Sequence, residues 1–439
     1  MHTLQRTVLS NGLVLLTVHQ PALTNACLTV FVPRGAWYDP PRKEGLAHFH
    51  EHMIFRGTEA HPSARAFSRA LREISTTFNA STCQSNVEII AACPTRSVGE
   101  MCRHIGDVIV CPAFDGIEVE RRVVQQELRE CLDPNGRELY MPRLAAIGTH
   151  GKGAHARSIL GTAKTITALT LDDLRRRHAR HFVARHMIVT LASSLPHEEA
   201  QALAAASFGR VPQGDAALSP PRQAPGRLAP APRAWTTGMP NAGLDLVFPG
   251  DGPAVPGGVM PDVVTELLAY DASSRLWQAV REERGLAYDV DAFVAVSPFS
   301  SQIQVSCDVA HEAVPEAARV CLGEIARLAW EGPTAEEMAA ATHDIEARHD
   351  GAETDADVLA TWYEHEEYTG TRRSFADINE GWSQATADEV RTFARQWFAP
   401  ANLYVSAVAN LRGRVRREFE ALPAYYAEAW ERERAASAR

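Results

Sequence analysis

The sequence predicts an α+β fold made of two homologous α/β-roll halves, each an antiparallel-dominated sheet with helices packed on one side. Apolar runs of strand length alternate along the chain with stretches of helical periodicity. A helix-and-strand unit also occurs twice, and a segment rich in proline and alanine separates the two occurrences. We therefore expect a first half at residues 1–212, a linker at 213–235 and a second half at 236–439.

The first elements of the chain show clear turn and strand signals. Residues 7–33 predict two strands, because Asn11-Gly12 in TVLSNGLVLLTV is a strong hairpin signal and LTVFVPRG follows as a second apolar run. The later elements expected in this half are helices at 44–57 and 64–75, a strand at 78–93, and helices at 96–109 and 116–132.

The repeated unit consists of a capped helix and the strand after it. TLDDLRRRHARHF begins at Thr170 with a capping residue and an acidic first turn, and the strand MIVTLAS follows. TADEVRTFARQWF begins at Thr386, and LYVSAV follows. Thr170 and Thr386 are 216 residues apart, and so are Phe182 and Phe398. This constant offset indicates two copies of one fold. The alternative is a chance likeness between two amphipathic helices, each followed by a strand.

The composition excludes several classes of protein. The 439 residues are 45% hydrophobic and 22% charged, with a formal net charge of -10, which is typical of a globular chain. No basic stripe with interleaved aromatic residues is present, so we expect no nucleic-acid partner. No apolar run is long enough to span a membrane, and the first residues do not form an export signal. We therefore expect a cytoplasmic protein with reduced thiols at its eight cysteines.

A dense polar cluster interrupts the apolar segment GLAHFHEHMIFRGT, residues 45–58. On a helix, His48 and His52 share one face, so both imidazoles can reach one metal ion, and Glu51 projects beside them. This spacing is H-x-x-E-H, in which the carboxylate can take a proton from a water molecule at the metal. The alternative is a polar helix face that holds histidines by chance. The apolar flanks argue against it, because buried histidines and glutamates need partners.

The repeat supports chemistry in the first half alone. The same offset of 216 gives the residues of the second half that correspond to the cluster: His48, Glu51 and His52 correspond to Val264, Leu267 and Leu268. A fold that accepts apolar side chains at these positions does not need histidines for stability. His50 lies on the opposite helix face from the His48–His52 pair, and we expect it not to bind the metal.

A third metal ligand is expected from the helix at 116–132, which contains four glutamates: Glu118, Glu120, Glu127 and Glu130. Glu120 and Glu127 are two turns apart on one face. Glu127 could bind the metal while Glu120 orients one of the histidines. Equally, these glutamates could form a solvated face paired with the neighbouring arginines. Spacing alone leaves both readings open.

The first half resembles the pitrilysin family of zinc peptidases, the M16 or inverzincin group, and in particular its short-chain bacterial type. GLAHFHEHMIFRGT is similar to the family signature around H-x-x-E-H, and VERRVVQQELRECLDP is similar to its downstream glutamate segment. The resemblance implies that His48, His52 and Glu127 hold Zn²⁺. It also implies that Glu51 is the general base and that Glu120 supports a ligand from behind.

The resemblance extends to the second half. SSRLWQAVREERGLAY, residues 273–288, is similar to a family segment that carries an arginine and a tyrosine, here Arg281 and Tyr288. In the family this pair grips the substrate and faces the metal across a closed chamber. The reading without the family is a helix-to-strand junction with a surface arginine and a packed tyrosine.

The strand around Asn79 is expected to hold an extended substrate by pairing along its edge. Asn79, Ala80 and Thr82 match the family pattern, whereas Val87 and Ile89 replace its usual threonine and tyrosine.

The expected function is a zinc-dependent endopeptidase that cleaves peptides or unfolded segments inside a closed chamber. The resemblance to the short-chain bacterial type, which is similar to mitochondrial processing peptidase subunits and commonly pairs two chains, implies a dimer. Because the chain carries both the metal motif and the Arg281–Tyr288 pair, a homodimer is expected, with a heterodimer with a related subunit as the alternative. One alternative is a non-catalytic, chamber-forming subunit of a heteromeric complex. Another is a peptide-binding module that keeps zinc for structure. A structural zinc site would need four protein ligands.

Overall fold

A computed structural model describes residues 2–133, 136, 139–150, 153, 156–215, 232–250, 258–297 and 300–438. Contacts divide the chain into two compact units. The first unit consists of Met1–Glu130, Arg157–Arg222 and Arg348–Arg372, and the second of Cys131–Ala156, Gln223–Ala347 and Arg373–Arg439. The units are therefore not two continuous stretches, unlike the halves 1–212 and 236–439 that the sequence suggested. Each unit contains one segment from the other half of the sequence.

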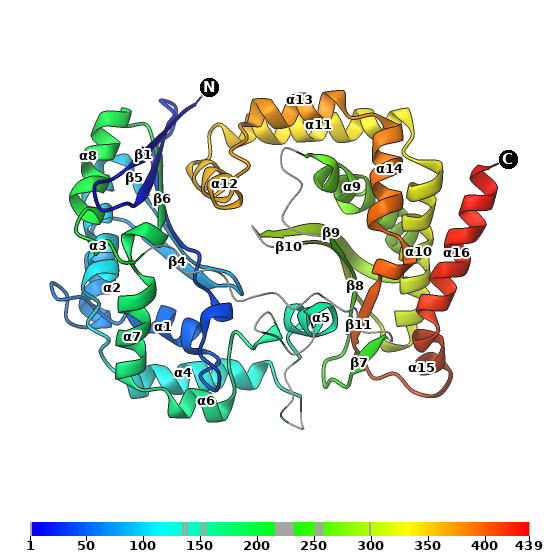
Figure 1. The fold of residues 1–439 in the computed structure, drawn as a ribbon, viewed down its shortest axis with the longest axis horizontal. Helices are drawn as coiled ribbons and strands as arrows, with labels where there is room; N and C mark the ends of the chain where they lie inside the picture. Colours follow the sequence, from blue (N-terminus) through cyan, green and yellow to red (C-terminus); the bar gives the residue numbers. More distant parts are fainter. Residues whose placement is uncertain are drawn as a thin grey trace. The chain divides into compact units, whose positions relative to one another are not determined.

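The first unit is built on a six-stranded sheet in the order β1-β2-β6-β3-β5-β4 (Figure 1). Its neighbouring strands pair antiparallel except β2 and β6, which are parallel. This confirms the antiparallel-dominated sheet. The strands are β1 Thr3–Val8, β2 Val14–His19, β3 Asn25–Val32, β4 Thr77–Thr82, β5 Val87–Pro94 and β6 Ile188–Ser193.

Two sequence expectations about these strands need correction. Residues 7–33 contribute to three strands, because β1 and β2 form the hairpin around Asn11-Gly12 and β3 is separate. Gly12 adopts the positive φ of +87° that the turn requires. The strand expected at 78–93 is the hairpin β4–β5, since Cys83 N–H donates to the Asn86 carbonyl at 2.8 Å and closes a turn.

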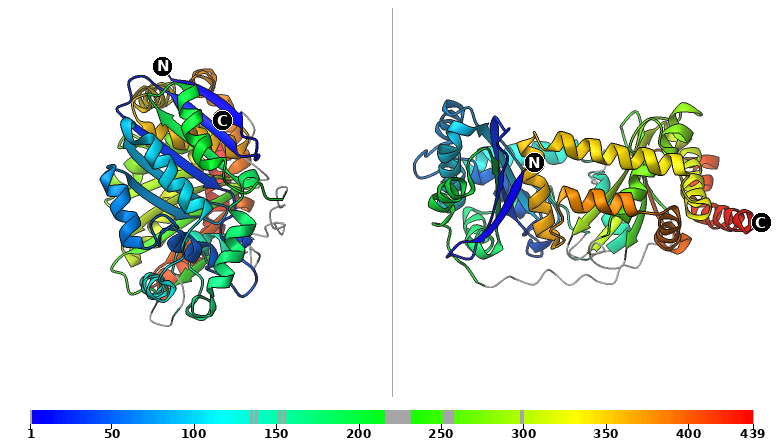
Figure 2. Two further views of the ribbon diagram at one scale, coloured as in Figure 1. Left: turned by 90° about the vertical axis from the view of Figure 1, so that its left-hand side faces the viewer. Right: turned by 90° about the horizontal axis from the view of Figure 1, so that it is seen from above.

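Helices cover both faces of this sheet. They are α1 Leu46–Ile54, α2 Ala64–Glu73, α3 Val98–Val110, α4 Ile117–Glu130, α6 Ala163–Ala168, α7 Leu171–His181, α8 His197–Phe208 and α12 Ala356–Thr369. The expected helices of the first half lie on one side, over a core that includes Leu28, Val30 and Phe49. Helix α12 packs on β3 and β6 from the other side (Figures 1 and 2). Side chains alternate along β3, so Phe31 faces α12 and stacks near Tyr368 at 4.6 Å.

The second unit has a five-stranded sheet in the order β7-β11-β8-β10-β9. Its strands are β7 Arg233–Trp235, β8 Ala242–Gly250, β9 Ala287–Ser297, β10 Ser300–Val309 and β11 Tyr404–Val408. Strand β7 lies inside the linker expected at 213–235 and pairs with β11, so that linker ends earlier than the sequence suggested. Residues 216–231 of it lie outside the described part of the chain.

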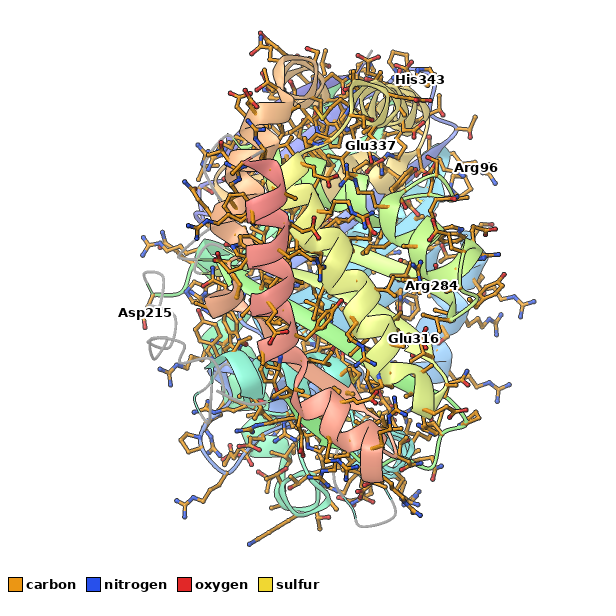
Figure 3. All side chains as sticks on the ribbon, turned by 90° about the vertical axis from the view of Figure 1, so that its right-hand side faces the viewer. Arg96, Asp215, Arg284, Glu316, Glu337 and His343 are labelled. Atoms are coloured by element: carbon orange, nitrogen blue, oxygen red, sulfur yellow. The ribbon has the colours of Figure 1, made fainter. Side chains whose placement is uncertain are left out.

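The helices of the second unit include one from the first half of the sequence. They are α5 Met141–His150, α9 Met260–Ala269, α10 Val314–Glu331, α11 Ala335–Ala352, α13 Phe375–Gln384, α14 Ala387–Trp397, α15 Gly413–Glu420 and α16 Leu422–Ser437; α11 ends within the first unit. Helix α5 packs on β8 and β11, with Ala145 against Val247 and Tyr404. Helix α16 lies beside α10, where Figure 3 also shows Glu316 and Arg284 among the charged side chains.

The two units repeat the capped helix and its strand. Thr170 and Asp173 form a capping box at the start of α7, and Thr386 and Glu389 form another at the start of α14. Strands β6 and β11 follow these helices. The second-half positions that correspond to the histidine cluster lie on α9 and are buried: Val264, Leu267 and Leu268. None of the described helices is both long and apolar enough to cross a membrane.

Candidate metal centre

Helix α1 and helix α4 bring three possible metal ligands together. His48 Nε2 and His52 Nε2 lie 3.2 Å apart, one turn from each other on α1. The Glu127 carboxylate, from α4, lies 3.4 Å from His48 Nε2 and 3.5 Å from His52 Nε2. These ligand atoms all lie within 4.8 Å of one another, and this is the one such group of three found in the described part of the chain. The three residues are those expected to hold the metal.

Glu120 supports His52 from behind. His52 donates its Nδ1–H to Glu120 Oε1 at 2.9 Å. This bond holds the Nδ1 proton, so that Nε2 is the nitrogen directed toward His48 and Glu127 and can bind a metal that displaces its proton. Glu120 itself is buried, and its second oxygen lies 3.3 Å from Arg56 Nη1. The geometry is the one expected of a carboxylate that orients a ligand.

Glu51 lies beside the group, and its carboxylate is buried. Burial raises its pKa, while His48, His52 and a hydrogen bond from the Thr82 hydroxyl lower it; the net effect is a raised pKa. The Thr82 hydroxyl donates to Glu51 Oε2 at 3.1 Å. Glu51 is therefore held in one orientation and has a higher proton affinity than an exposed glutamate, as a general base requires.

The donor set fits zinc. Two imidazoles and one carboxylate are three protein ligands, the number typical of a catalytic zinc site with an open fourth position. Hydrogen bonds from His48 and His52 hold the pKa of the Glu127 carboxyl below its usual range. Burial lowers the pKa of His52, but hydrogen bonds to Glu120 and Glu127 outweigh it and raise that pKa to about 10. The carboxylates of Glu120 and Glu127 thus stabilise the protonated form of His52, and a divalent cation can take the place of that proton.

A remote carboxylate fixes the start of α1. The helix begins after Gly45, whose φ is +89°, and no side chain of the neighbouring residues caps it. Instead, Ala47 N–H donates to Asp39 Oδ1 at 3.0 Å. Arg177, from α7, donates to the same carboxylate at 3.0 Å, and both charged side chains are buried. Local spacing could not reveal this contact, because Arg177 lies far away in the sequence.

The residues expected to bind substrate in the first unit lie on β4. This strand is at one edge of the six-stranded sheet, so its outer side has no partner strand among the described residues. Asn79 is exposed, and Ala80 and Thr82 are partly exposed. Thr82 also contacts Glu51, so the edge strand ends beside the expected general base.

Arg281 and Tyr288 pair with each other in the second unit. The Arg281 guanidinium carbon lies 4.7 Å from the centre of the Tyr288 ring and 4.5 Å from that of Trp277. Arg281 belongs to a π-helix, Trp277–Glu282, and Tyr288 is the second residue of β9. Tyr288 leaves 82% of its side chain exposed, which contradicts the alternative of a packed tyrosine.

His50 takes no part in the metal centre. Its imidazole is completely buried, and its Nε2 shares a hydrogen bond of 3.1 Å with His178 Nδ1 on α7. Its ring also packs on Phe182 at 4.6 Å. The helical period had placed it opposite the His48–His52 pair, and the structure agrees.

Comparison with known proteins identifies the family. The family model for insulinase (peptidase family M16) matches residues 14–162, and that for the peptidase M16 inactive domain matches residues 168–343. An uncharacterized zinc protease of Mycobacterium leprae is 31% identical over 310 residues, 68% of each chain. The mitochondrial-processing peptidase subunit beta of Blastocladiella emersonii is 29% identical over 212 residues, 48% of this chain and 45% of that one.

A solved structure shows the same fold over almost the whole chain. The structure of a peptidase M16 inactive domain from Pseudomonas fluorescens has a TM-score of 0.83 at 16% identity, and the match covers 94% of this chain and 98% of that one. The family models for both halves of the sequence, the fold and the relatives named as zinc proteases thus all indicate the same family. The chain belongs to the M16 family of peptidases, the insulinase or pitrilysin family, whose cofactor is zinc.

Proposed function

We propose that the chain is a zinc-dependent endopeptidase that cleaves peptides or unfolded segments. His48, His52 and Glu127 hold the zinc ion in this proposal. The observation that carries it is the group of three ligand atoms with the buried Glu51 carboxylate beside it. Three protein ligands leave one coordination position for chemistry, as in catalytic zinc sites.

The chain's own residues would divide the work as follows. Zinc, when bound, supplies a Lewis acid that acidifies water and polarises a carbonyl group. Glu51 takes the proton from the attacking water and delivers it to the leaving amine. The Thr82 hydroxyl holds Glu51 in position, at 3.1 Å. Glu120 keeps His52 in the tautomer that binds metal.

The edge of β4 supports an extended substrate. A peptide in strand conformation can pair with the free side of β4 along Asn79, Ala80 and Thr82. Phe55, at the end of α1, and Phe78, on β4, lie 4.9 Å apart and are both partly exposed. They offer an apolar surface to a substrate side chain beside the metal helix. A folded substrate does not present a free strand, which favours peptides and unfolded segments.

Arg281 and Tyr288 are proposed to bind the substrate from the second unit. The contact of the Arg281 guanidinium with the Tyr288 ring fixes the direction of both side chains. A phenol hydroxyl is a suitable donor to the oxyanion that forms when water attacks a carbonyl group. Pairing with a second copy or a related subunit, which would close a chamber around the substrate, is also a proposal. The mass of the purified protein in solution tests the pairing.

The decisive experiment compares wild type with Glu51→Gln. Wild type is expected to hold about one zinc ion per chain and to cut members of a quenched-peptide library. Glu51→Gln is expected to keep the zinc and to lose cleavage by at least about 100-fold, since general base catalysis is removed. Glu118→Gln, an exposed change on α4, is the matched control and should cut at the wild-type rate. Equal cleavage by Glu51→Gln and wild type would remove Glu51 from the mechanism.

A non-catalytic, chamber-forming or peptide-binding subunit is the second candidate. It is favoured by the description of the family model that matches residues 168–343 as an inactive domain. In that case wild type would bind zinc and peptides but cut nothing, alone or in the presence of a related catalytic subunit. Zinc-dependent cleavage by the purified chain would exclude it.

A further inference from the structure

Arg56 contacts the carboxylate behind the metal helix. Its Nη1 lies 3.3 Å from Glu120 Oε2, while Glu120 Oε1 accepts from His52 at 2.9 Å. The two oxygens of Glu120 thus have different partners, which fixes the plane of the carboxylate. Arg56 is itself mostly enclosed, with 23% of its side chain exposed. This partial burial strengthens the ion pair relative to one on an open surface.

The loop before α4 is shaped to hold the same guanidinium. Arg56 Nε donates to the Asp115 carbonyl at 3.2 Å. Gly116, with a φ of +69°, follows directly, and a Cβ at this position would lie 2.7 Å from Arg56 Nη2. An alanine here would therefore displace the guanidinium. Arg56 is held at two points, by a carbonyl and by a carboxylate, and glycine leaves the space for it.

We propose that Arg56 is a positioning residue for the metal centre. It holds Glu120 in the orientation that accepts the Nδ1–H of His52, so that His52 directs Nε2 toward the metal. This inference rests on the proposed function, because it concerns the same zinc ion. The described contacts of the Arg56 guanidinium are with the Asp115 carbonyl and the Glu120 carboxylate, and it acts on the metal centre through Glu120.

The shape of the side chain explains why an arginine is suited to this position. A planar guanidinium can donate to the Asp115 carbonyl and to the Glu120 carboxylate from different nitrogens at once. A lysine carries the same charge on one nitrogen and can satisfy only one of them at a time. Arg56→Lys should therefore rescue part of the effect, whereas Arg56→Met removes the charge and keeps an apolar stem.

The experiment measures the rate at which zinc leaves the full chain into excess chelator. Arg56→Met should release zinc about threefold to tenfold faster than wild type, less than the roughly 10–100-fold expected when a carboxylate directly on a ligand is lost. Arg56→Lys should lie between the two. Gly116→Ala should also release zinc faster than wild type, because its Cβ displaces the guanidinium. Arg69→Met is the control, because Arg69 forms an exposed ion pair with Glu73 on α2.

A double variant separates positioning from general damage. Once Arg56 is methionine, Gly116→Ala should speed zinc release by less than it does in wild type, because the group it displaces is gone and only the backbone strain of alanine at a φ of +69° remains. The rise in melting temperature that added zinc produces should be smaller in Arg56→Met than in the Arg69→Met control, whatever the melting temperatures of the two proteins without zinc. Fully additive effects of Arg56→Met and Gly116→Ala, a wild-type release rate in Arg56→Met, or a zinc-dependent rise equal to that of the control would each overturn the inference.

The outcome also distinguishes this inference from the proposed function. A wild type that holds zinc but cuts no peptide would count against the peptidase, while the release rates would still decide the role of Arg56. A wild type that holds no zinc would overturn both.

Discussion

Tyr288 is the most exposed of the large apolar and aromatic side chains in the described part of the chain, at 82%. An aromatic ring in water gives up the free energy of burial, and here a neighbouring cation holds the ring in that exposed position. This exposure is in keeping with the proposed part of Tyr288 in substrate binding. The same unit buries other tyrosines completely, such as Tyr426, whose hydroxyl donates to the Phe398 carbonyl at 2.7 Å. The exposure of Tyr288 is thus a property of its position on β9 and not of the tyrosines of this unit in general.

Replacing this tyrosine tests its proposed part in the reaction. Tyr288→Phe keeps the ring beside Arg281 and removes the hydroxyl. We expect kcat to fall by about 10-fold or more with little change in KM, because an oxyanion donor acts mainly in the transition state. Tyr270→Phe, also in the second unit, should leave kcat unchanged. An unchanged kcat in Tyr288→Phe would leave the tyrosine with a role in binding at most.

Single residues differ in how far the sequence can predict their roles. His48, Glu51 and His52 are one turn apart on one helix, so their spacing alone predicts that they meet. Glu127 comes from another helix. Its spacing on that helix fits a metal ligand and an exposed salt-bridge residue equally well, and the family resemblance is what favours the ligand. Arg56 carries no local signal, because its contacts with Asp115 and Glu120 depend on how the chain folds back.

At the scale of elements, α12 has an unusual contact surface with the sheet of the first unit. Glu364 on this helix is buried and lies close to Glu88 on β5. Burial raises the pKa of Glu364, the Glu88 carboxyl raises it further, and the Thr29 hydroxyl lowers it; the net effect is a raised pKa. Burial also raises the pKa of Glu88. The two carboxyl groups therefore retain a proton in the folded chain that exposed glutamates would release.

This pair predicts a pH dependence of stability. The pKa of Glu364 is higher folded than unfolded, so the unfolded chain releases the proton first as the pH rises through the ordinary value of 4.5. The folded state loses stability above that pH until Glu364 itself ionises. Glu364→Gln removes this loss and should raise the melting temperature at pH 8, by about 2–4 °C for each ~1 kcal/mol regained.

The comparison across pH provides the control. The gain from Glu364→Gln should shrink toward pH 4, where Glu364 of wild type is largely protonated in the folded and in the unfolded state alike. Glu73→Gln, at an exposed glutamate of α2, should show no such trend. A gain that is the same at both pH values would mean that the glutamine acts through packing and not through the proton.

Elements with local signals were predictable, and those defined by long-range contacts were not. The helices at Thr170 and Thr386 carry their capping boxes in the sequence, and the structure reproduces both. The hairpin β4–β5 was read as one strand, because the turn between Cys83 and Asn86 contains neither glycine nor proline. The position of α12 on the first sheet has no signature in its own residues, since a half-polar helix fits many surfaces.

At the scale of the whole molecule, metal and fold are linked. The three expected ligands lie on α1 and α4, which both belong to the first unit. None of the three comes from the second unit. A ligand that binds only the folded chain stabilises it by mass action, by about 4 kcal/mol at 1,000 times its dissociation constant. Zinc should therefore stabilise the first unit specifically.

Removal of zinc tests this link. Calorimetry with a chelator is expected to lower the melting transition of the first unit, and added zinc should restore it. His48→Ala should melt at the same temperature with and without chelator, because a ligand is missing. A wild type whose melting is insensitive to both chelator and zinc would show that the three residues do not hold a metal.

The exchange of α5 and α12 between the units has a consequence for fragments of this chain. A polypeptide ending near residue 212 would lack α12, and its sheet would expose the side chains that this helix covers, among them Phe31. A polypeptide beginning near residue 236 would lack α5, which packs on Val247 and Tyr404. Each fragment thus carries a helix that packs on the sheet of the other fragment. Cut between these points, the two pieces are expected to behave as complementing fragments that need one another to fold, and not as separable domains.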